Sequence, residues 1–536
     1  MSLISIGVSG LTAAQIALTT SSNNTTNAYT DGYTRQVANF SESTSGNGVQ
    51  VSSVSREYNQ FVTTQLNGSI SAESALSTQQ TEVDQIDSLL ADSDASLDAL
   101  LQNFFSAIQT LTSDASDTAA REEVVGAAQT LASQFNQLGS YLSAMADDVN
   151  NQIDDQVSQI NDLSDQIATL NSQISLSTTL GSSANDLLDQ RDLLVSQLSE
   201  LVAVDVTVQD NGSYTVALSN GMALVSGNDS FALSTEASAS DASQSSISYI
   251  DAAGNSVTLD NSVLDSGSLG GLIEFRDSTL AETQNQLGLM AVSLTQAFNT
   301  LQAQGIDLNG DSGTAMFSVA DPVVTGNTGN SGDATMTAIF SDDVSALTSS
   351  DYTVAWSDNQ GFTVTRNDTG ASVDASYDSD SGTLSFAGMA LTVSGTAEDG
   401  DSFLVQPTRN AASSFTALLS DGEQIAAGTS SGSSDNTNAL AMLNLQTSDI
   451  VGGSATLSET YASLVSNVGS TATRVAAQLQ TQSALTEQLT TLQQSESGVN
   501  LDEEAANLIV YQQYYQACAK IVEVGTTVLD TILNID

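Results

Sequence analysis

The residue types that usually carry catalysis or hold metals are scarce in this chain. Its 536 residues include no histidine and a single cysteine, Cys518. Without an imidazole there is no general base for a Ser-His-Asp triad and no neighbouring group to activate the Cys518 thiol. One cysteine also excludes an intramolecular disulfide and a thiolate zinc site. Because Cys518 falls within an apolar helical pattern, we interpret it as a small packing residue.

Adjacent carboxylates are the other pattern with chemical potential. They occur at Asp147-Asp148, Asp154-Asp155 and Glu503-Glu504. Paired carboxylates can act as acid and base in hydrolysis. In a chain with 63 acidic residues, however, such pairs arise by chance and are typical of solvated surfaces. We therefore predict no catalytic residue and no enzyme activity.

One short stretch has the beginning of a calcium-loop spacing. Asp307, Asn309 and Asp311 stand at the first three ligand positions. Ser312 occupies the place of the glycine that the loop requires, and Ser318 that of the bidentate glutamate. We interpret the stretch as a turn after a helix, and we predict no metal and no cofactor.

The charge balance excludes several classes of partner. The chain carries 63 acidic and 9 basic residues, a net charge of −54. Such a surface repels nucleic acid and anionic lipid, so neither nucleic acid nor membrane is expected as a partner. The sequence predicts no apolar run long enough to span a membrane. The first basic residue is Arg35, so the basic N-terminal region of a signal peptide is not expected. Self-association of so acidic a chain should depend on salt.

The two ends of the chain are apolar at helical spacing, over 3–22 and 501–533. At the second end Asn500 can cap the helix, and acidic residues including Glu503 follow in its first turn. Two interpretations stay open: a pair of ordinary helices packed on their own domain, or surfaces that join subunits. The candidate interface residues are Ile4, Val8, Leu11, Leu18, Leu501, Leu508, Tyr511, Tyr515, Val522, Leu529 and Leu533.

Between the ends, helical and strand patterns alternate. Long heptad patterns predict helices over about 70–111, 124–174, 271–303 and 455–495, which suit a rod-like bundle built from both halves of the chain. Alternating Val and Thr with turn residues predict inserted β-rich parts. The predicted class is α+β multidomain, with terminal coiled-coil helices, a helical bundle stem and β-rich outer domains. The predicted domains are 1–40 with 498–536 (terminal helices), 41–201 with 268–318 and 411–497 (stem), 202–267 (inserted β-rich domain) and 319–410 (outer β-rich domain).

Several segments resemble a known family. NNTTNAYTDGYTRQ (23–36) and SGVNLDEEAANLIVYQQYYQACAKI (497–521) are similar to the two end signatures of flagellar axial proteins. LLDQRDLLVSQLSELVAVDV (187–206), LGGLIEFRDSTL (269–280) and GIDLNGDSG resemble the hook-associated protein 1 family of FlgK type. The resemblance is weak over 320–410. The first signature departs from the family at Thr25, Thr26 and Asp31, the last of which replaces a proline of the turn.

The resemblance implies a structural protein of the bacterial flagellum. Members form a layer at the hook–filament junction, outside the cell, with the terminal helices lining the inner tube and the β domains facing out. The implied partners are further copies of the chain, the hook protein, the second junction protein next to the filament and a FlgN-type export chaperone that binds the C-terminal segment. Export would use the flagellar type III apparatus without a cleaved signal peptide.

Three other functions remain as alternatives. The first is another flagellar axial protein, of the hook or distal rod, which would share the end signatures but not the long helix at 124–174. The second is an acidic surface adhesin with β domains on a coiled-coil stalk. The third is a secreted hydrolase that uses an acidic pair within 320–410.

Overall fold

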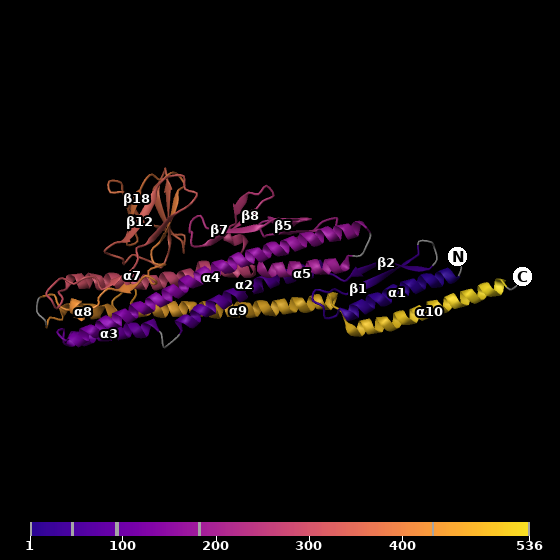
Figure 1. Cartoon of the computed structure of the whole chain (residues 1–536), viewed down its shortest axis with the longest axis horizontal. Coiled ribbons are helices and arrows are strands. Elements are labelled where there is room, and N and C mark those ends of the chain that lie inside the picture. The colour runs from indigo at the N-terminus through magenta and orange to yellow at the C-terminus, as the bar shows by residue number, and fades with distance from the viewer. Residues whose placement is uncertain (1–2, 44–47, 92–95, 181–183, 431–433, 534–536) are drawn as a thin grey trace.

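The structure is a computed structural model that describes residues 3–43, 48–91, 96–180, 184–430 and 434–533. In the described part, long helices form an extended stem and β-rich parts project from one side of it (Figure 1). The predicted α+β multidomain class is confirmed. The helices are α1 (Leu3–Thr26), α2 (Gln60–Leu90), α3 (Leu97–Ser113), α4 (Thr118–Thr179), α5 (Asn185–Leu201), α6 (Gly267–Phe275), α7 (Ala281–Gln304), α8 (Thr437–Asn444), α9 (Leu457–Ser497) and α10 (Leu501–Leu533).

Helix α4 is the longest element of the stem. It has 62 residues, a length of about 93 Å at 1.5 Å per residue. The Asp117 side chain caps its first turn by accepting a hydrogen bond from the backbone N–H of Ala119. Its apolar stripe is buried on both sides of the phase shift near residue 150, for example at Leu142 and Ile160. The predicted helix at 124–174 is thus confirmed as part of one continuous helix.

Two other helix predictions need correction. The single helix predicted at 70–111 is wrong, because α2 ends at Leu90 and α3 begins at Leu97; residues 92–95 lie outside the described part. The break lets α2 pack along α9 while α3 packs on α4 and α8, which one straight helix could not do. The helix predicted at 271–303 is three consecutive segments, since a π-helical turn, η2 (Arg276–Leu280), joins α6 to α7.

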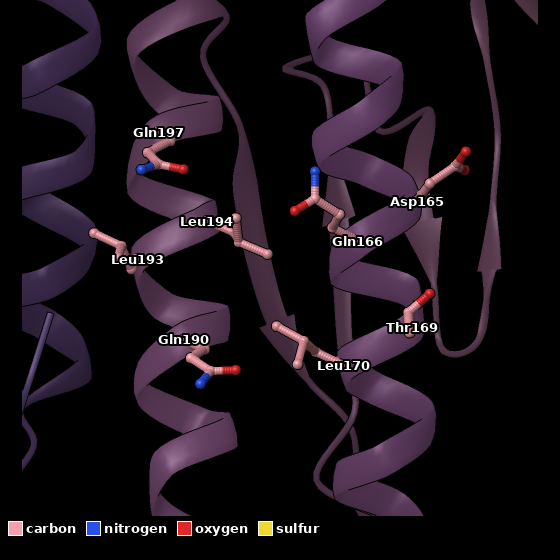
Figure 2. A pocket seen from close by; sticks show the side chains of 8 residues that line it. All are labelled: Asp165, Gln166, Thr169, Leu170, Gln190, Leu193, Leu194 and Gln197. Atoms are coloured by element: carbon pink, nitrogen blue, oxygen red, sulfur yellow. The ribbon is translucent and has the colours of Figure 1, made fainter.

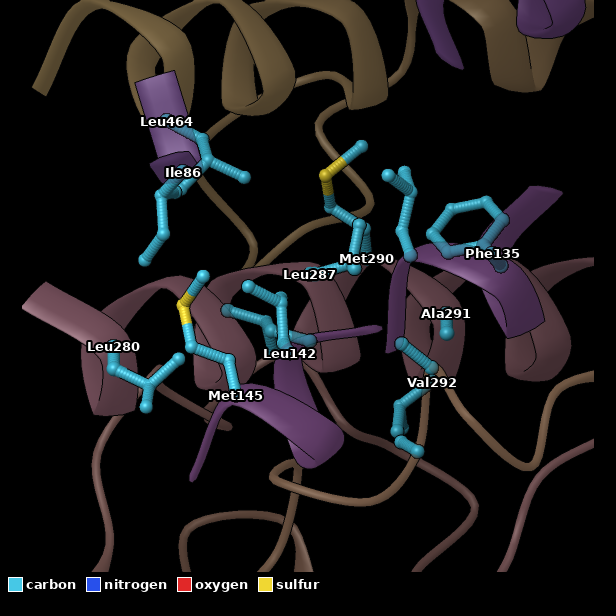
Figure 3. Close-up of a cluster of buried hydrophobic side chains, with 14 of the residues drawn as sticks. Ile86, Phe135, Leu142, Met145, Leu280, Leu287, Met290, Ala291, Val292 and Leu464 are labelled. Carbon is cyan, nitrogen blue, oxygen red and sulfur yellow. The ribbon is translucent and has the colours of Figure 1, made fainter. Parts of the chain in front are cut away.

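The core of the stem is assembled from both halves of the chain. Helix α2 packs against α9, α6 and α5, and α5 packs against α4. Figure 3 shows apolar side chains that meet from α2 (Ile86), α4 (Leu142), α7 (Leu287, Met290) and α9 (Leu464). A bundle of this kind buries its apolar stripes only after distant segments have come together.

The β-rich parts are antiparallel wherever strands pair in the described residues, as the alternating sequences predict. The first part has two small sheets and the second has two larger ones. The first comprises β3 (Asp205–Val208), β4 (Tyr214–Ala217), β5 (Ala223–Ser226) and β6 (Asp229–Ser230), followed by β7 (Leu233–Ala237), β8 (Ser245–Ile250) and β9 (Ser256–Thr258). In the second part, one sheet has the strand order β11 (Val323–Gly326), β19 (Ser402–Gln406), β13 (Tyr352–Ser357), β14 (Gly361–Arg366), β15 (Ser372–Val373). The other sheet has the strand order β12 (Thr335–Phe340), β18 (Met389–Ser394), β17 (Thr383–Phe386), β16 (Ser376–Asp378).

Two further pairs of strands complete the architecture. β1 (Gln36–Glu42) pairs with β2 (Val49–Arg56) beside the terminal helices. β10 (Phe317–Ser318) pairs with β20 (Thr416–Ala417) at the base of the second β-rich part. Short 3₁₀ turns lie at η1 (Asn261–Val263), η3 (Gly422–Gln424) and η4 (Leu445–Thr447).

The expectation about membrane-spanning segments is wrong for α1. By length and composition alone, this one helix of the described residues could cross a membrane. Its 24 residues include no charged side chain. In the structure α1 instead lies along α10, with its small side chains buried. The apolar composition of α1 therefore serves a close helix pair.

Candidate functional site: the paired terminal helices

Helices α1 and α10 lie side by side, and the two chain ends meet at one tip of the molecule (Figure 1). They run antiparallel, since Ile4 is near Gly525 while Ser21 bonds to Glu504. The bounds of α10 follow from local signals. Asn500 Oδ1 accepts from the backbone N–H groups of Asp502 and Glu503, as predicted for a capping residue.

Small residues form the contact between the two helices. The buried residues of α1 include Gly7 and Gly10, and those of α10 are Glu504, Cys518 and Gly525. A Cβ at Gly7 would stand 2.6 Å from Val522 Cγ2, and one at Gly10 would stand 2.5 Å from Cys518 Sγ. A larger residue at either position would therefore require neighbouring atoms of α10 to shift. The predicted role of Cys518 as a packing residue agrees with its burial here.

A buried ion pair closes the base of the helix pair. Glu504 is only 2% exposed, and its carboxylate receives Arg35 Nε at 2.9 Å and Ser21 Oγ at 2.5 Å. Arg35 also pairs with the exposed Glu503 at 3.0 Å. Its backbone N–H donates to Ser497 O at 2.8 Å, at the end of α9. Arg35 thus joins residues more than 450 positions apart in the sequence.

The first signature segment folds around Asn24. Asn24 Oδ1 accepts from the Tyr33 hydroxyl and from the backbone N–H of Gln36, both at 2.9 Å. Its Nδ2 donates to Gln36 O at 2.8 Å. Gly32 makes the turn with a φ of +76°, which a glycine tolerates and which needs no proline at Asp31. The signature is therefore a compact connector from α1 to β1.

The connector is fixed to the stem through the DQRD segment (residues 189–192) of α5. Asp189 accepts from the Thr34 hydroxyl at 2.5 Å and from Arg56 at 2.9 Å. Arg56 also pairs with Asp192 at 2.6 Å. All three ionic side chains are nearly buried, so these bonds hold the terminal helices in one orientation relative to α5.

Burial shapes the protonation of this connector. It raises the pKa of Tyr33 to about 12, and the nearby Asp189 carboxylate adds to the shift. Burial also raises the pKa of Asp189, although its bonds from Thr34 and Arg56 oppose that effect. Burial likewise raises the pKa of the Cys518 thiol, which keeps it protonated and unreactive at neutral pH.

Arg191 of the same DQRD segment stabilises the first β-rich part. Its side chain is 1% exposed, and Nη1 donates to Asn171 Oδ1 and to Gly212 O, both at 2.8 Å. The guanidinium carbon lies 3.3 Å from the centre of the Tyr214 ring. A cation that bonds carbonyl oxygens and covers an aromatic face has a structural role.

The predicted interface residues lie along the flanks of the small-residue contact, where all of them are exposed or partly buried. Two of them, Ile4 and Val522, also contact the opposite terminal helix, at Gly525 and Gly7. The exposed ones are Val8, Leu501, Tyr515, Leu529 and Leu533, and the partly buried ones are Ile4, Leu11, Leu18, Leu508, Tyr511 and Val522.

The flanks form an uncovered apolar surface at the tip. Besides the predicted residues it includes Ile509 (57% exposed), Val510 and Ile532. No acidic residue occurs before Asp31 or between Glu504 and Glu523. Beyond its first turn α10 carries only Glu523 and Asp530 as carboxylates, so in a chain of net charge −54 this tip is apolar and poor in carboxylates.

Sequence reasoning missed the residues that join the two ends. The carboxylate pattern predicts that Glu504 belongs to a solvated pair, which is wrong because its side chain is buried. The contacts of Gly7, Gly10 and Gly525 were not predicted. One available signal was the run of small residues at helical spacing in α1, which is typical of close helix packing. Nothing local in the sequence indicates that Arg35 meets Glu504.

The other candidate sites offer little chemistry. Asp307 Oδ1 accepts from the backbone N–H groups of Asn309 and Asp311, both at 2.9 Å, which is a turn. An open groove of about 460 Å³ lies between α4 and α5, with Leu170 and Leu194 facing into it and glutamines at its rim (Figure 2). Within the described ranges no three His, Cys, Asp or Glu side chains cluster as metal ligands.

Family models match most of the chain. The "Flagellar hook-associated protein FlgK helical domain" matches residues 83–317, and the "Flagellar hook-associated protein 1, D2-like domain" matches 325–407. The "Flagellar basal body rod FlgEFG protein C-terminal" matches 493–535, which includes α10. Paired termini, a long helical stem and projecting β domains thus define a structural protein of the flagellar axis.

The relatives identify the family within that class. The chain is 40% identical over 552 residues to flagellar hook-associated protein 1 of Salmonella typhimurium and 39% identical over 547 residues to that of Escherichia coli, with all of each chain covered. The flagellar hook junction protein FlgK from Burkholderia pseudomallei has a similar structure, with a TM-score of 0.75 and 31% identity over 81% of this chain and 100% of that one. The chain belongs to the flagellar hook-associated protein 1 (FlgK) family.

Proposed function

We propose that this protein forms a structural layer between the hook and the filament of the bacterial flagellum and is needed for filament attachment. The observation that carries the proposal is the apolar, carboxylate-poor tip formed by α1 and α10. An apolar surface of this extent is costly in water and is stabilised when a neighbouring subunit covers it. Family membership supports this junction over the hook or distal rod.

The partners follow from the same surface and from the family. Further copies of the chain cover the tip to form the layer, with the hook protein on one side and the second junction protein on the other. A FlgN-type export chaperone binds α10 before assembly, as an amphipathic helix in a groove. The chain is exported through the flagellar type III apparatus without a cleaved signal peptide and acts outside the cell, and it has no enzymatic role.

The predicted division into domains completes the proposal. The terminal helices face the inner tube, the stem forms the next layer and the domain at 319–410 faces outward. The projecting position of the second β-rich part in Figure 1 supports this arrangement. The residues proposed to contact neighbours are the eleven predicted from periodicity, on both flanks of the helix pair.

One substitution tests the proposed contacts. Leu529→Asp places a charge on the exposed apolar flank, so the protein should fold and be exported but fail to join the flagellum. Leu176→Asp, at an exposed leucine of α4, is the matched control and should assemble normally. Export and incorporation are measured by immunoblot of medium and of purified flagella. Normal incorporation of Leu529→Asp would refute the interface.

Deletion of the gene tests the function itself. Electron microscopy should show hooks without filaments, with flagellin lost to the medium. Cells without hooks would move the protein to the rod or the hook. Intact flagella would remove the flagellar role and favour the adhesin.

A further inference from the structure

One exposed face of the stem lacks the acidity of the rest of the chain. It runs along α9 through residues spaced three or four apart, all exposed in this structure: Arg474, Gln478, Thr481, Leu485, Gln488 and Leu492. Between Glu459 and Glu487 there is no acidic residue, the longest such interval after Asp31. Leu485 and Leu492 are 46% and 42% exposed. We call these six residues the α9 face.

Arg474 is unusual among the nine cations. Its Nη1 donates to Gln478 Oε1 at 3.3 Å, and within the described ranges it forms no ion pair. The other basic side chains are all engaged within the chain. Arg35, Arg56, Arg276, Arg366, Arg409 and Lys520 pair with carboxylates, while Arg121 and Arg191 donate to backbone or amide oxygens.

A complementary acidic stripe lies on the opposite flank of the stem. Asp148, Asn151, Asp155, Ser158 and Asp162 of α4 are exposed and share one helix face. Helix α2 lies between this part of α4 and α9, since α9 packs on α2 and Gln152 of α4 donates to Glu82 of α2. In Figure 1 α9 follows the lower side of the stem, whereas α4 crosses the stem obliquely from the lower side near α3 to the upper side near α5.

We infer that the α9 face of one subunit docks on the α4 stripe of a neighbouring copy in the layer. The α9 face covers about 27 Å and the stripe about 21 Å at 1.5 Å per residue, so the stripe can cover about three quarters of the face. Two subunits of net charge −54 approach with least repulsion where one side carries no carboxylate. A contact between two different surfaces is head-to-tail, so it repeats from subunit to subunit as a closed ring or an open helix. The inference rests on the proposed function.

Engineered cysteines test the contact in assembled flagella. Thr481→Cys on α9 and Ser158→Cys on α4 are combined in a Cys518→Ala background, and purified hook ends are treated with a short bismaleimide. Links between copies should give a ladder of dimers and larger species. Each single cysteine should give at most dimers, and Thr481→Cys with Ser116→Cys, in the turn just before α4, should give no ladder.

A charge reversal adds a second measurement. Arg474→Glu places a carboxylate opposite the stripe and should reduce incorporation several-fold, and Asp155→Arg in the same chain should restore it. Absence of the ladder, or wild-type incorporation of Arg474→Glu, would overturn the inference. If the protein is missing from hook ends altogether, the proposed function fails; if it is present without a ladder, only the α9–α4 contact fails.

Discussion

Single side chains decide how the two ends of this protein meet. Arg35 is the central one, because it bonds to α10 through Glu504 and to the end of α9 through Ser497. A buried charge needs partners of this kind, and removal of one member of an ion pair leaves the charge of the other uncompensated. The connector around Asn24 and Asp189 then fixes the direction in which the terminal helices leave the stem.

Replacement of the buried carboxylate should loosen the helix pair. We expect Glu504→Ala to cost about 3 kcal/mol, because Arg35 and Ser21 lose their common partner in a buried site. Glu503→Ala is the control, because Glu503 is the other carboxylate that pairs with Arg35. The Glu503 side chain is 56% exposed, so its loss should cost less than about 1 kcal/mol. Calorimetry of both variants checks this. Equal destabilisation would contradict the role assigned to Glu504.

At the scale of elements, close packing and buried ion pairs hold the parts together. The glycines of α1 let two helices pack with almost no space between their backbones. The second β-rich part is joined to the rest by Arg409, which follows β19. Arg409 pairs with Asp241 of the first β-rich part at 3.1 Å and with Asp351, just before β13.

A methyl group at Gly7 should separate the terminal helices. Alanine normally improves a helix by about 1 kcal/mol over glycine. At Gly7 the new Cβ would meet Val522 Cγ2 and the backbone of α10 within 3.2 Å, so overpacking of about 1–3 kcal/mol should prevail. Hydrogen exchange along α1 should become faster. Gly126→Ala on α4, where a Cβ meets nothing within 4 Å, should leave α4 unchanged or more protected.

Loss of Arg409 should free the second β-rich part. Burial raises the pKa of Asp351 and Arg409 opposes that effect, so Arg409→Ala leaves a buried carboxylate without its cation. We expect faster proteinase K cleavage near residues 319–322 with the domain itself intact. Arg366→Ala, which breaks a pair with Asp368 two residues away, should leave that cleavage rate unchanged.

Local patterns predicted the elements better than their contacts. The start of α10 follows from Asn500 and the course of α4 from its heptads, because both depend on neighbours in sequence. The pairing of Arg35 with Glu504 was not predictable, since it depends on how stem helices bring distant segments together. Glycine and alanine of α1 occupy the contact between the two terminal helices because small side chains allow closer backbones. The interface predicted for the large apolar residues concerns neighbouring subunits and stays a prediction.

The whole molecule combines an apolar tip with a strongly acidic body. The tip favours association, and the net charge of −54 opposes it. Six of the nine cations pair with carboxylates within the fold, and Arg121 and Arg191 are buried, so few remain to neutralise a neighbour. Counterions in solution therefore set the balance between the two effects.

Self-association should increase with salt. The screening length falls from about 30 Å at 0.01 M to about 8 Å at 0.15 M, which removes most repulsion between exposed carboxylates. Sedimentation of the purified protein at both ionic strengths measures the effect, with potassium chloride as the only variable. Weaker association at the higher ionic strength would show that attraction between charges, and not apolar contact, holds the subunits together.

The position of the one tryptophan has a practical consequence. Trp356 lies on β13, with Phe362 at 4.6 Å between ring centres, in the second β-rich part. Its intrinsic fluorescence therefore reports on that part alone, whereas circular dichroism at 222 nm follows the helices of the stem and tip. Denaturation followed by both signals in one sample would reveal whether the projecting domain melts with the rest of the subunit or independently of it.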